Sequence, residues 1–316
     1  MTLAADRGLA ALASGVFALL AVATVAGSIL RARCAGTPAA PTIANVNARI
    51  RAWWVMAALF VAATAIGRAG SIVLFSITSF LALREFVTLA PTRAGDHRAL
   101  FSAFFVVTPL QYALIWIGSY GLFTVLIPIY AAMFVAIRTA LTGDTERFLE
   151  RTATNQWGLM ICVYFVSYVP ALTLLRIPGY EGQNAKLMFF LVLIVELSDV
   201  LQYVWGKTMG RRAIAPAVSP NKTWEGFAGG IACATLIGTA VWWATPFSPA
   251  AAAVISLATT LMGFCGGLIM SAIKRGGGVK DYGTLIGGHG GVLDRIDSLC
   301  FAAPVFFHLT RFFYAS

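Results

Sequence analysis

Charged residues are scarce in this chain: Asp, Glu, Lys and Arg make up 11% of its 316 residues, whereas 59% are hydrophobic. A soluble domain is typically about 45–50% apolar and about 25% charged, so an ordinary soluble domain is excluded. A helix of about 20 mainly apolar residues can cross a bilayer. The sequence therefore predicts an all-α, polytopic integral membrane protein with nine or ten transmembrane helices, at about residues 8–30, 52–67, 69–90, 99–117, 120–137, 156–176, 186–206, 227–245, 250–270 and 298–314. The run at 52–67 is short, so pairing with the next run as a re-entrant segment stays open.

Cysteine is sparse as well, and its spacing excludes an obvious metal or disulfide framework. The five cysteines are scattered, most of them in apolar runs, and no pair has metal-ligand spacing. We expect them to act as small buried hydrophobic residues. The first apolar run lacks a strongly basic segment before it, so it is interpreted as a retained helix and not as a signal peptide.

Acidic residues are few too, 13 against 23 Lys and Arg, and the net charge is +10. With ten helices, alternate loops collect all of these cations except Arg7, Arg68, Arg176, Lys186 and Arg311. The positive-inside rule makes the crowded side cytoplasmic and puts both termini outside. Because the cations are spread over five membrane-tethered loops and also suit anionic lipid headgroups, nucleic-acid binding is a poor explanation.

Two regions follow from the distribution of polar residues. Residues 1–155 predict a scaffold of N-terminal transmembrane helices with few buried polar groups, and residues 156–316 a C-terminal transmembrane catalytic region. Linker-like composition appears only at 34–48 and 212–220. No internal repeat is present, and inverted repeats would have favoured a transporter.

A first polar cluster lies inside an apolar run, where Glu196, Asp199 and Tyr203 occupy positions i, i+3 and i+7 of one helical face. A carboxylate facing lipid is costly, so we expect Asp199 to face a polar cavity. A helix end that dips into the interface, with Asp199 solvated, is the alternative. The place of Glu196 stays open.

A second cluster runs from Ser219 to Gly226. Ser219 followed by Pro220 fits a helix N-cap and its first helical position. Such a helix start attracts phosphate, with Lys222 and Thr223 nearby. Ordinary capping beside a loop cation is the competing interpretation. The glycines that follow predict close helix packing.

A third cluster begins with Ser271, Lys274 and Arg275, which are spaced to point together at one phosphate from a helix end. Glycines 276–278 then end the helix, and Lys280 and Asp281 precede a glycine-rich segment at 287–291 that holds His289. His289 is a candidate phosphate ligand or acid.

Asp294 and Asp297 complete this cluster at the start of the last helix. Spaced i and i+3, the two carboxylates can share one cation through oxygen ligands. A surface loop with a structural Asp–Arg pair is the bland alternative, which the density of matched groups disfavours.

These residues resemble the phosphatidate cytidylyltransferase family, also called CDP-diacylglycerol synthases, in a divergent bacterial branch. The family signature reads Ser-x-x-Lys-Arg, four residues, Lys-Asp-x-Gly, then Pro-Gly-His-Gly-Gly, two residues, Asp-Arg-x-Asp. The matching residues here are Ser271, Lys274, Arg275, Lys280, Asp281, Gly283, Gly288, His289, Gly290, Gly291, Asp294, Arg295 and Asp297. The upstream pattern is matched by Asp199, Tyr203, Gly206, Ser219, Pro220, Lys222, Thr223, Glu225 and Gly226.

Three positions depart from the family pattern. Gly267 stands where the family has a metal-binding aspartate, Gly276 where an acid follows Lys-Arg, and Gly287 where a proline precedes Gly-His-Gly-Gly. The first departure removes one carboxylate from the expected cation site, which leaves either an impaired protein or a site completed by another group.

The resemblance implies transfer of a cytidylyl group from CTP to phosphatidic acid, which gives CDP-diacylglycerol and pyrophosphate. It implies catalytic roles for Lys274, Arg275, Lys280, Asp281 and His289 and a metal site at Asp294, Asp297 and Asp281. It implies substrate binding by Asp199, Tyr203, Ser219, Lys222, Thr223, Ser271, Gly288, Gly290, Gly291 and Arg295. The expected cofactor is Mg²⁺, with a second monovalent or divalent cation and a homodimer left open.

The resemblance to a bacterial branch implies a multi-pass protein of the bacterial cytoplasmic membrane, and the charge distribution makes the active site face the cytoplasm. Two alternatives stay open. A related CTP-dependent transferase would act on another lipid acceptor, and a catalytically impaired homologue would only bind lipid or nucleotide.

Overall fold

The computed structural model describes residues 7–34, 36, 37, 39–283 and 290–315. Within these residues, nine helices of 21 to 28 residues are long and apolar enough to cross a membrane. The described strands form one short hairpin. The prediction of an all-α polytopic membrane protein is confirmed. The five cysteine thiols are free, and those of Cys162 and Cys300 are buried.

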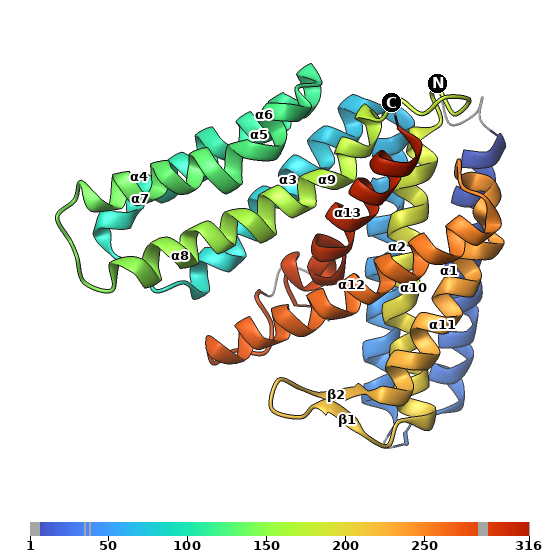
Figure 1. The fold of residues 1–316 in the computed structure, drawn as a ribbon. Coiled ribbons are helices and arrows are strands. Elements are labelled where there is room, and N and C mark those ends of the chain that lie inside the picture. The colour runs from blue at the N-terminus through green and yellow to red at the C-terminus, as the bar shows by residue number, and fades with distance from the viewer. Residues whose placement is uncertain (1–6, 35, 38, 284–289, 316) are drawn as a thin grey trace.

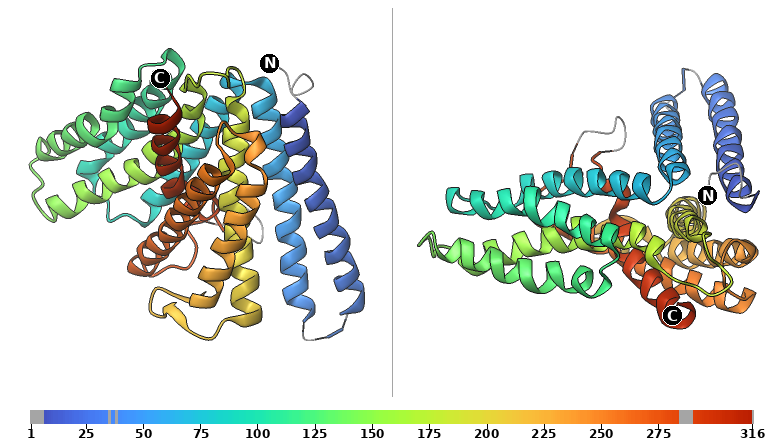
Figure 2. Two further views of the ribbon diagram at one scale, coloured as in Figure 1. Left: turned by 45° about the vertical axis from the view of Figure 1, so that its right-hand side comes forward. Right: turned by 90° about the horizontal axis from the view of Figure 1, so that it is seen from above.

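The first two helices, α1 (Arg7–Arg33) and α2 (Ala40–Ile66), form an outlying antiparallel pair (Figure 2). The Trp54 indole N–H donates to the Thr24 hydroxyl at 3.0 Å, and the Trp54 and Phe17 rings stack at 5.6 Å. Residues 40–48 of the expected linker are helical instead, and the re-entrant alternative is excluded, because α2 begins at Ala40 and has 27 residues. Pro41 in its first turn and the alanines after it suit a helix start.

Three long helices follow α3 (Arg68–Leu89), and each contains a π-helical segment. They span Ala94–Ile117, Tyr120–Ala140 and Phe148–Leu174. Each π segment contains a proline or ends within five residues of one, namely Pro109, Pro128 and Pro170. Proline lacks the N–H that continues the α-helical ladder, which accounts for these irregular turns. The elements are η1 (Ala94–Asp96), α4 (His97–Ser102), η2 (Ala103–Val107), α5 (Thr108–Ile117), α6 (Tyr120–Val125), η3 (Leu126–Ala131), α7 (Ala132–Ala140), α8 (Phe148–Leu159), η4 (Met160–Phe165), α9 (Val166–Ala171) and η5 (Leu172–Leu174).

The remaining elements are α10 (Asn184–Met209), β1 (Ala213–Ala215), β2 (Ser219–Thr223), α11 (Trp224–Ala240), η6 (Trp242–Ala244), α12 (Pro249–Gly276) and α13 (Leu293–Tyr314). The run expected at 227–245 becomes α11, which has 17 residues and is shorter than the nine spans. Its glycines let it approach α10: a Cβ at Gly230 would lie 2.6 Å from the Gln202 nitrogen. The prediction of close glycine-mediated packing is confirmed.

Both termini lie at one end of the bundle and the β1–β2 hairpin at the other (Figure 1). Helices α1, α2, α10 and α11 stand upright in that view and α3–α9 are inclined; α13 lies between the two groups, and α12 crosses the upright helices. Helix α13 is largely buried, with Phe306 and Phe307 fully enclosed. The core of the bundle therefore surrounds the helix that carries Asp294 and Asp297.

The N-terminal helices bury more polar groups than the sequence led us to expect. The side chains of Glu85, Asp96, Gln111, Arg151 and Asn155 are all buried. The expectation failed because the polar groups pair across elements distant in sequence. Arg151, for example, reaches Asp96 at 3.0 Å. The division into regions 1–155 and 156–316 stays a prediction, and its boundary falls within α8.

Candidate active site

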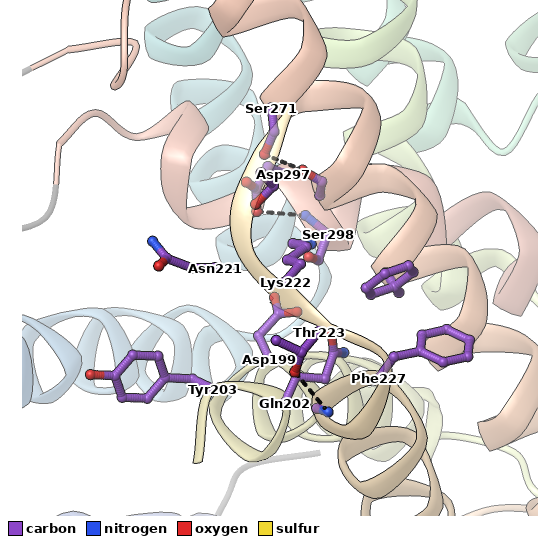
Figure 3. Close-up of a pocket in the computed structure, with 14 residues that line it drawn as sticks. Asp199, Gln202, Tyr203, Asn221, Lys222, Thr223, Phe227, Ser271, Asp297 and Ser298 are labelled. Atoms are coloured by element: carbon purple, nitrogen blue, oxygen red, sulfur yellow. Dashed lines mark hydrogen bonds between the residues drawn. The ribbon is translucent and has the colours of Figure 1, made fainter. Parts of the chain in front are cut away.

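A pocket of about 280 Å³ opens between α10, β2, α11, α12 and α13. It lies at the hairpin end of the bundle, and its side chains converge from segments far apart in the sequence (Figure 3). It is lined by Asp199, Gln202, Tyr203, Ser219, Asn221, Lys222, Thr223, Gly226, Phe227, Phe264, Gly267, Ser271, Asp297 and Ser298. Asp199 therefore faces a polar cavity, as its helical position predicted, whereas Glu196 is not part of the described lining.

Two carboxylates from different helices meet at this pocket, Asp199 from α10 and Asp297 from α13. Ser298 connects them, because its backbone N–H donates to Asp297 Oδ1 at 2.8 Å and its hydroxyl bonds to Asp199. Like charges held close together repel each other unless a cation lies between or beside them. The two carboxylates therefore favour a cation inside the pocket.

Lys222 of β2 supplies one such charge. Its ammonium lies 4.7 Å from the centre of the Phe264 ring and interacts electrostatically with both Asp199 and Asp297. A Cβ built at Gly267 would lie 2.7 Å from Lys222 Nζ, which real side chains do not tolerate without a shift. Glycine at 267 therefore leaves the space that the Lys222 side chain occupies.

The helix start next to Lys222 differs from the predicted one. Ser219 is no N-cap but pairs with Ala215 in the antiparallel hairpin, and the cap is Thr223, whose Oγ1 accepts the Gly226 N–H at 3.1 Å. The register Ala213↔Thr223 keeps residues 219–223 extended, so α11 begins four residues later than expected. Ser219, Lys222 and Thr223 nevertheless all line the pocket.

Glu225 anchors this hairpin to α11. Its Oε2 accepts the backbone N–H groups of Arg211 at 3.0 Å and Arg212 at 3.3 Å. These N–H donors, that of Arg211 first, lower the pKa of the Glu225 carboxyl below its usual value. The carboxylate thereby ties the strand that carries Lys222 to the first turn of α11.

Asp294 lies outside the pocket lining, and both of its carboxylate oxygens accept hydrogen bonds from protein groups. Its Oδ1 accepts Lys274 Nζ at 2.8 Å, and its Oδ2 accepts the N–H groups of Tyr282 at 2.8 Å and Gly291 at 2.9 Å. Gly290 has φ +80, a left-handed conformation that favours glycine, and a Cβ there would also lie 2.7 Å from Asp294 Oδ2. Asp294 thus joins the end of α12 and the loop to the start of α13.

The predicted phosphate cluster of Ser271, Lys274 and Arg275 does not converge. Ser271 lines the pocket and donates to the Gly267 carbonyl at 2.7 Å, Lys274 pairs with Asp294, and the exposed Arg275 donates to the Val279 carbonyl at 3.0 Å. The helix does end at Gly276, as predicted. Lys280 and Asp281 are exposed on the loop, and Gly288 and His289 lie outside the described residues.

The sequence pattern described as the cytidylyltransferase family matches residues 47–313, which is most of the chain. The chain belongs to the cytidylyltransferase family. Helix α1 lies before the matched segment. The match covers every residue that lines the pocket.

Three relatives of this cytidylyltransferase-family protein show how the similarity is spread. A protein of Escherichia coli (strain K12), named as uncharacterized protein YnbB, is 38% identical over 94% of this chain and 96% of its own length. Phosphatidate cytidylyltransferase of Staphylococcus aureus (strain COL) is 31% identical over 60% of this chain and 76% of its own length. Phosphatidate cytidylyltransferase of Bacillus subtilis (strain 168) is 30% identical over 65% and 74%.

The donor set of this cytidylyltransferase-family pocket fits Mg²⁺ held partly by substrate. Among the described residues, no three His, Cys, Asp or Glu side chains come together as a metal site. Mg²⁺ is, however, usually bound through one or two carboxylates plus substrate phosphates. Asp199 and Asp297 provide two such carboxylates, whereas the predicted ligands Asp294 and Asp281 do not line the pocket.

Glu85 is the main residue that sequence reasoning missed. Its Oε1 accepts the Val292 N–H and its Oε2 the Leu293 N–H, both at 2.9 Å, at the start of α13. A Cβ at Gly283 or Gly291 would collide with its carboxylate, at 2.8 Å and 2.2 Å. Glu85 is the single acid in the apolar run at 69–90, a signal of the kind that singled out Asp199.

Other missed residues belong to the pocket wall: Gln202, Asn221, Phe227, Phe264 and Ser298. Helical spacing could have indicated Phe264, because Phe264, Gly267 and Ser271 occupy i, i+3 and i+7 of α12. Arg295, by contrast, was predicted to bind substrate but is not in the described lining. It interacts electrostatically with Asp297 and Glu196.

Proposed function

We propose that this protein transfers a cytidylyl group from CTP to phosphatidic acid and releases pyrophosphate. The observation that carries this proposal is the convergence of Asp199, Lys222 and Asp297, from three separate elements, in one pocket of a membrane protein poor in charge. Family membership and the names of the Staphylococcus and Bacillus relatives support it.

The chemistry requires two polyanions to meet. A phosphate oxygen of phosphatidate attacks the α-phosphorus of CTP, a new P–O bond forms, and the bond to the bridging oxygen breaks so that pyrophosphate leaves. Lys222 offsets the repulsion between the substrates and the charge that develops on the leaving group. Mg²⁺ held by Asp199 and Asp297 would supply further charge neutralisation on the phosphates.

The remaining wall groups orient the nucleotide. The hydroxyls of Ser219 and Ser271 and the Asn221 amide offer hydrogen-bond partners, and the first turn of α11 presents its positive pole to the pocket. The Phe227 and Phe264 rings exclude water from one side. The lipid approaches sideways between helices with its acyl chains in the bilayer, on the cytoplasmic side of the bacterial cytoplasmic membrane.

Incorporation of radiolabelled CTP into phosphatidate, measured on the purified full-length protein in detergent, tests this proposal. Asp297→Asn should lower turnover about 100-fold or more, because one of the two carboxylates that would hold Mg²⁺ beside the phosphates is lost. Asp294→Asn is the comparison: it should lower turnover without moving the Mg²⁺ concentration for half-maximal rate. A shift of that concentration in Asp294→Asn would instead return Asp294 to the metal site. Full turnover in Asp297→Asn would refute the assignment of Asp297.

A second candidate function rests on Gly267, where Lys222 fills the place of a side chain. A protein impaired by this exchange would bind lipid or nucleotide without turnover. Pyrophosphate release from CTP and phosphatidate separates the two functions: none from the parent, together with a gain in Gly267→Asp, favours the binding function. Competition among other lipid phosphates and polyprenol phosphates identifies a transferase with a different acceptor.

A further inference from the structure

A second cavity, of about 500 Å³, lies at the end of the bundle where both termini are found, opposite the hairpin (Figure 1). Its wall is built from the start of α3, the turn between α5 and α6, the segment after η5 and the last turns of α13. Nothing in the proposed transfer reaction uses this cavity. Its volume falls within the usual range of ligand sites, about 300–1,000 Å³.

Positive charge gathers in this cavity. Arg68, Arg176 and Arg311 all line it, and they are three of the five cations that the sequence assigned to this side of the membrane. Among the described lining residues none is acidic. The positive-inside rule keeps cations rare on this side, so their convergence from three distant segments calls for an explanation.

Neutral groups of the protein orient the two guanidinium groups of Arg68 and Arg311. Arg68 donates to the Trp116 carbonyl at 2.8 Å and to the Ile115 carbonyl, both at the end of α5. The Arg311 guanidinium lies 3.8 Å from the centre of the Tyr120 ring, which itself stacks on Phe307. Carbonyls and a ring fix the position of these cations, and within the part of the chain that the structure describes neither forms an ion pair with a carboxylate.

The rim of the cavity has the character of a membrane interface. The Trp116 side chain, 58% exposed, and Ile117, 71% exposed, lie beside Arg68, and Phe312, 81% exposed, follows Arg311. Tryptophan is enriched at the level of lipid headgroups. The exposed Trp116 beside Arg68 therefore suits a cavity that lies at headgroup level.

We propose that this arginine cavity binds a phosphate group, with Arg68 and Arg311 as its principal donors. Guanidinium groups match phosphate oxygens with paired N–H donors, which makes arginine well suited to this ligand. The ligand chemistry is that of a phosphate mono- or diester, available from an anionic phospholipid or from solution. The site is independent of cytidylyl transfer and lies at the far end from Asp199 and Asp297.

Thermal unfolding of the full-length protein in neutral detergent, with added phosphatidylglycerol, phosphatidylcholine or inorganic phosphate, tests the site. Phosphatidylglycerol should raise the melting temperature of the parent more than phosphatidylcholine does. The double variant Arg68→Gln/Arg311→Gln should bind it at least tenfold more weakly, since each charge-assisted contact contributes about a factor of ten or more. Arg7→Gln, on the same side but outside the cavity, should bind as the parent does.

The inorganic phosphate measurement distinguishes the sources. A shift that depends on Arg68 and Arg311 with inorganic phosphate assigns a soluble anion, and one found only with phosphatidylglycerol assigns a lipid headgroup. If the double variant does not fold, Arg311→Lys replaces it, which keeps the charge but loses the paired donors and should weaken binding severalfold. Equal binding by the parent and these variants, with every probe, would overturn the proposal.

Discussion

Carboxylates in the N-terminal helices α1–α9 and in the C-terminal elements α10–α13 are held in different ways. In the first region, Asp96 accepts hydrogen bonds from the Arg151 guanidinium and the Arg93 N–H. Glu85 accepts them from two backbone N–H groups. Asp199 and Asp297, in the second, face a pocket. A carboxylate saturated by the protein positions other groups, whereas one that faces a cavity is available to a ligand.

Asp294 shows that this difference does not follow the regions alone. It belongs to α13 and lies one turn before Asp297, yet it is saturated like Asp96. Carboxylates that are held by protein donors, namely Glu85, Asp96 and Asp294, thus occur in both regions, whereas the two pocket carboxylates belong to the second.

Arg151→Met should give the largest loss of stability. Arg151 and Asp96 are almost fully buried, 2% and 0% exposed, and the pair is 3.0 Å apart. Removal of the cation leaves the buried Asp96 carboxylate without its partner, which should lower the free energy of unfolding by about 3 kcal/mol. This is the lower end for a buried pair, because the second partner of Arg151, Asp144, is partly exposed and loses less. Thermal unfolding in detergent should show a clear fall in melting temperature.

Turnover per folded molecule should stay unchanged in Arg151→Met, because the pair is remote from the pocket. Glu150→Gln is the matched control, since it removes an exposed ion pair with Arg147 on the same helix and should change little. Loss of turnover without loss of stability in Arg151→Met would place this ion pair in the catalytic machinery.

Glu85→Gln should mainly impair catalysis. Gln can accept only one of the two N–H groups at the start of α13, and its amide N–H₂ would then face the other donor. The loss of one charge-assisted hydrogen bond, about 1.5–3 kcal/mol, corresponds to a fall of roughly ten- to hundredfold in the maximal rate. The melting temperature should fall less than in Arg151→Met.

A separate measurement of the CTP concentration for half-maximal rate sharpens this prediction. Glu85 acts through the loop and α13 and does not line the pocket, so this concentration should move less than the maximal rate. Glu150→Gln again serves as the control. A loss of folded protein with full turnover per folded molecule would make Glu85 purely structural.

Much of the fold follows from apolar runs of membrane length, and the face of α10 that carries Asp199 and Tyr203 follows from helical spacing. The hairpin could not be predicted in this way. It depends on pairing between residues 213–215 and 219–223 and on the Glu225 contacts with Arg211 and Arg212, which are tertiary. Residues 40–48 look like a linker in composition, yet they continue a helix that packs on α1.

The candidate site shows the same limit. Spacing places Asp294 and Asp297 on one helical face, but it does not say that Lys274 of α12 and two loop N–H groups will occupy Asp294. Nor does spacing reveal that Glu85, about 200 residues upstream, meets the first turn of the same helix. Both facts depend on how separate helices dock, whereas the pocket role of Asp199 needed only the cost of a carboxylate in lipid.

Gly267→Ala should have the smallest effect and probes the pocket directly. The new Cβ would lie 2.7 Å from Lys222 Nζ and 3.2 Å from the Ser298 hydroxyl, so the flexible end of the Lys222 side chain must move away. The shift is cheap for the fold, so the melting temperature should change little, but the ammonium leaves its place beside Asp199 and Asp297, which we expect to lower turnover roughly two- to tenfold, equivalent to about 0.5–1.5 kcal/mol.

Gly276→Ala, at the end of the same helix, is the matched control for Gly267→Ala, because nothing lies within 4 Å of a Cβ at that position. It should leave turnover intact. Equal turnover in both variants would mean that Lys222 can leave the space beside Gly267 without consequence, and its charge would then not be needed next to Asp199 and Asp297. A selective loss in Gly267→Ala would show that the pocket depends on the ammonium that this glycine admits.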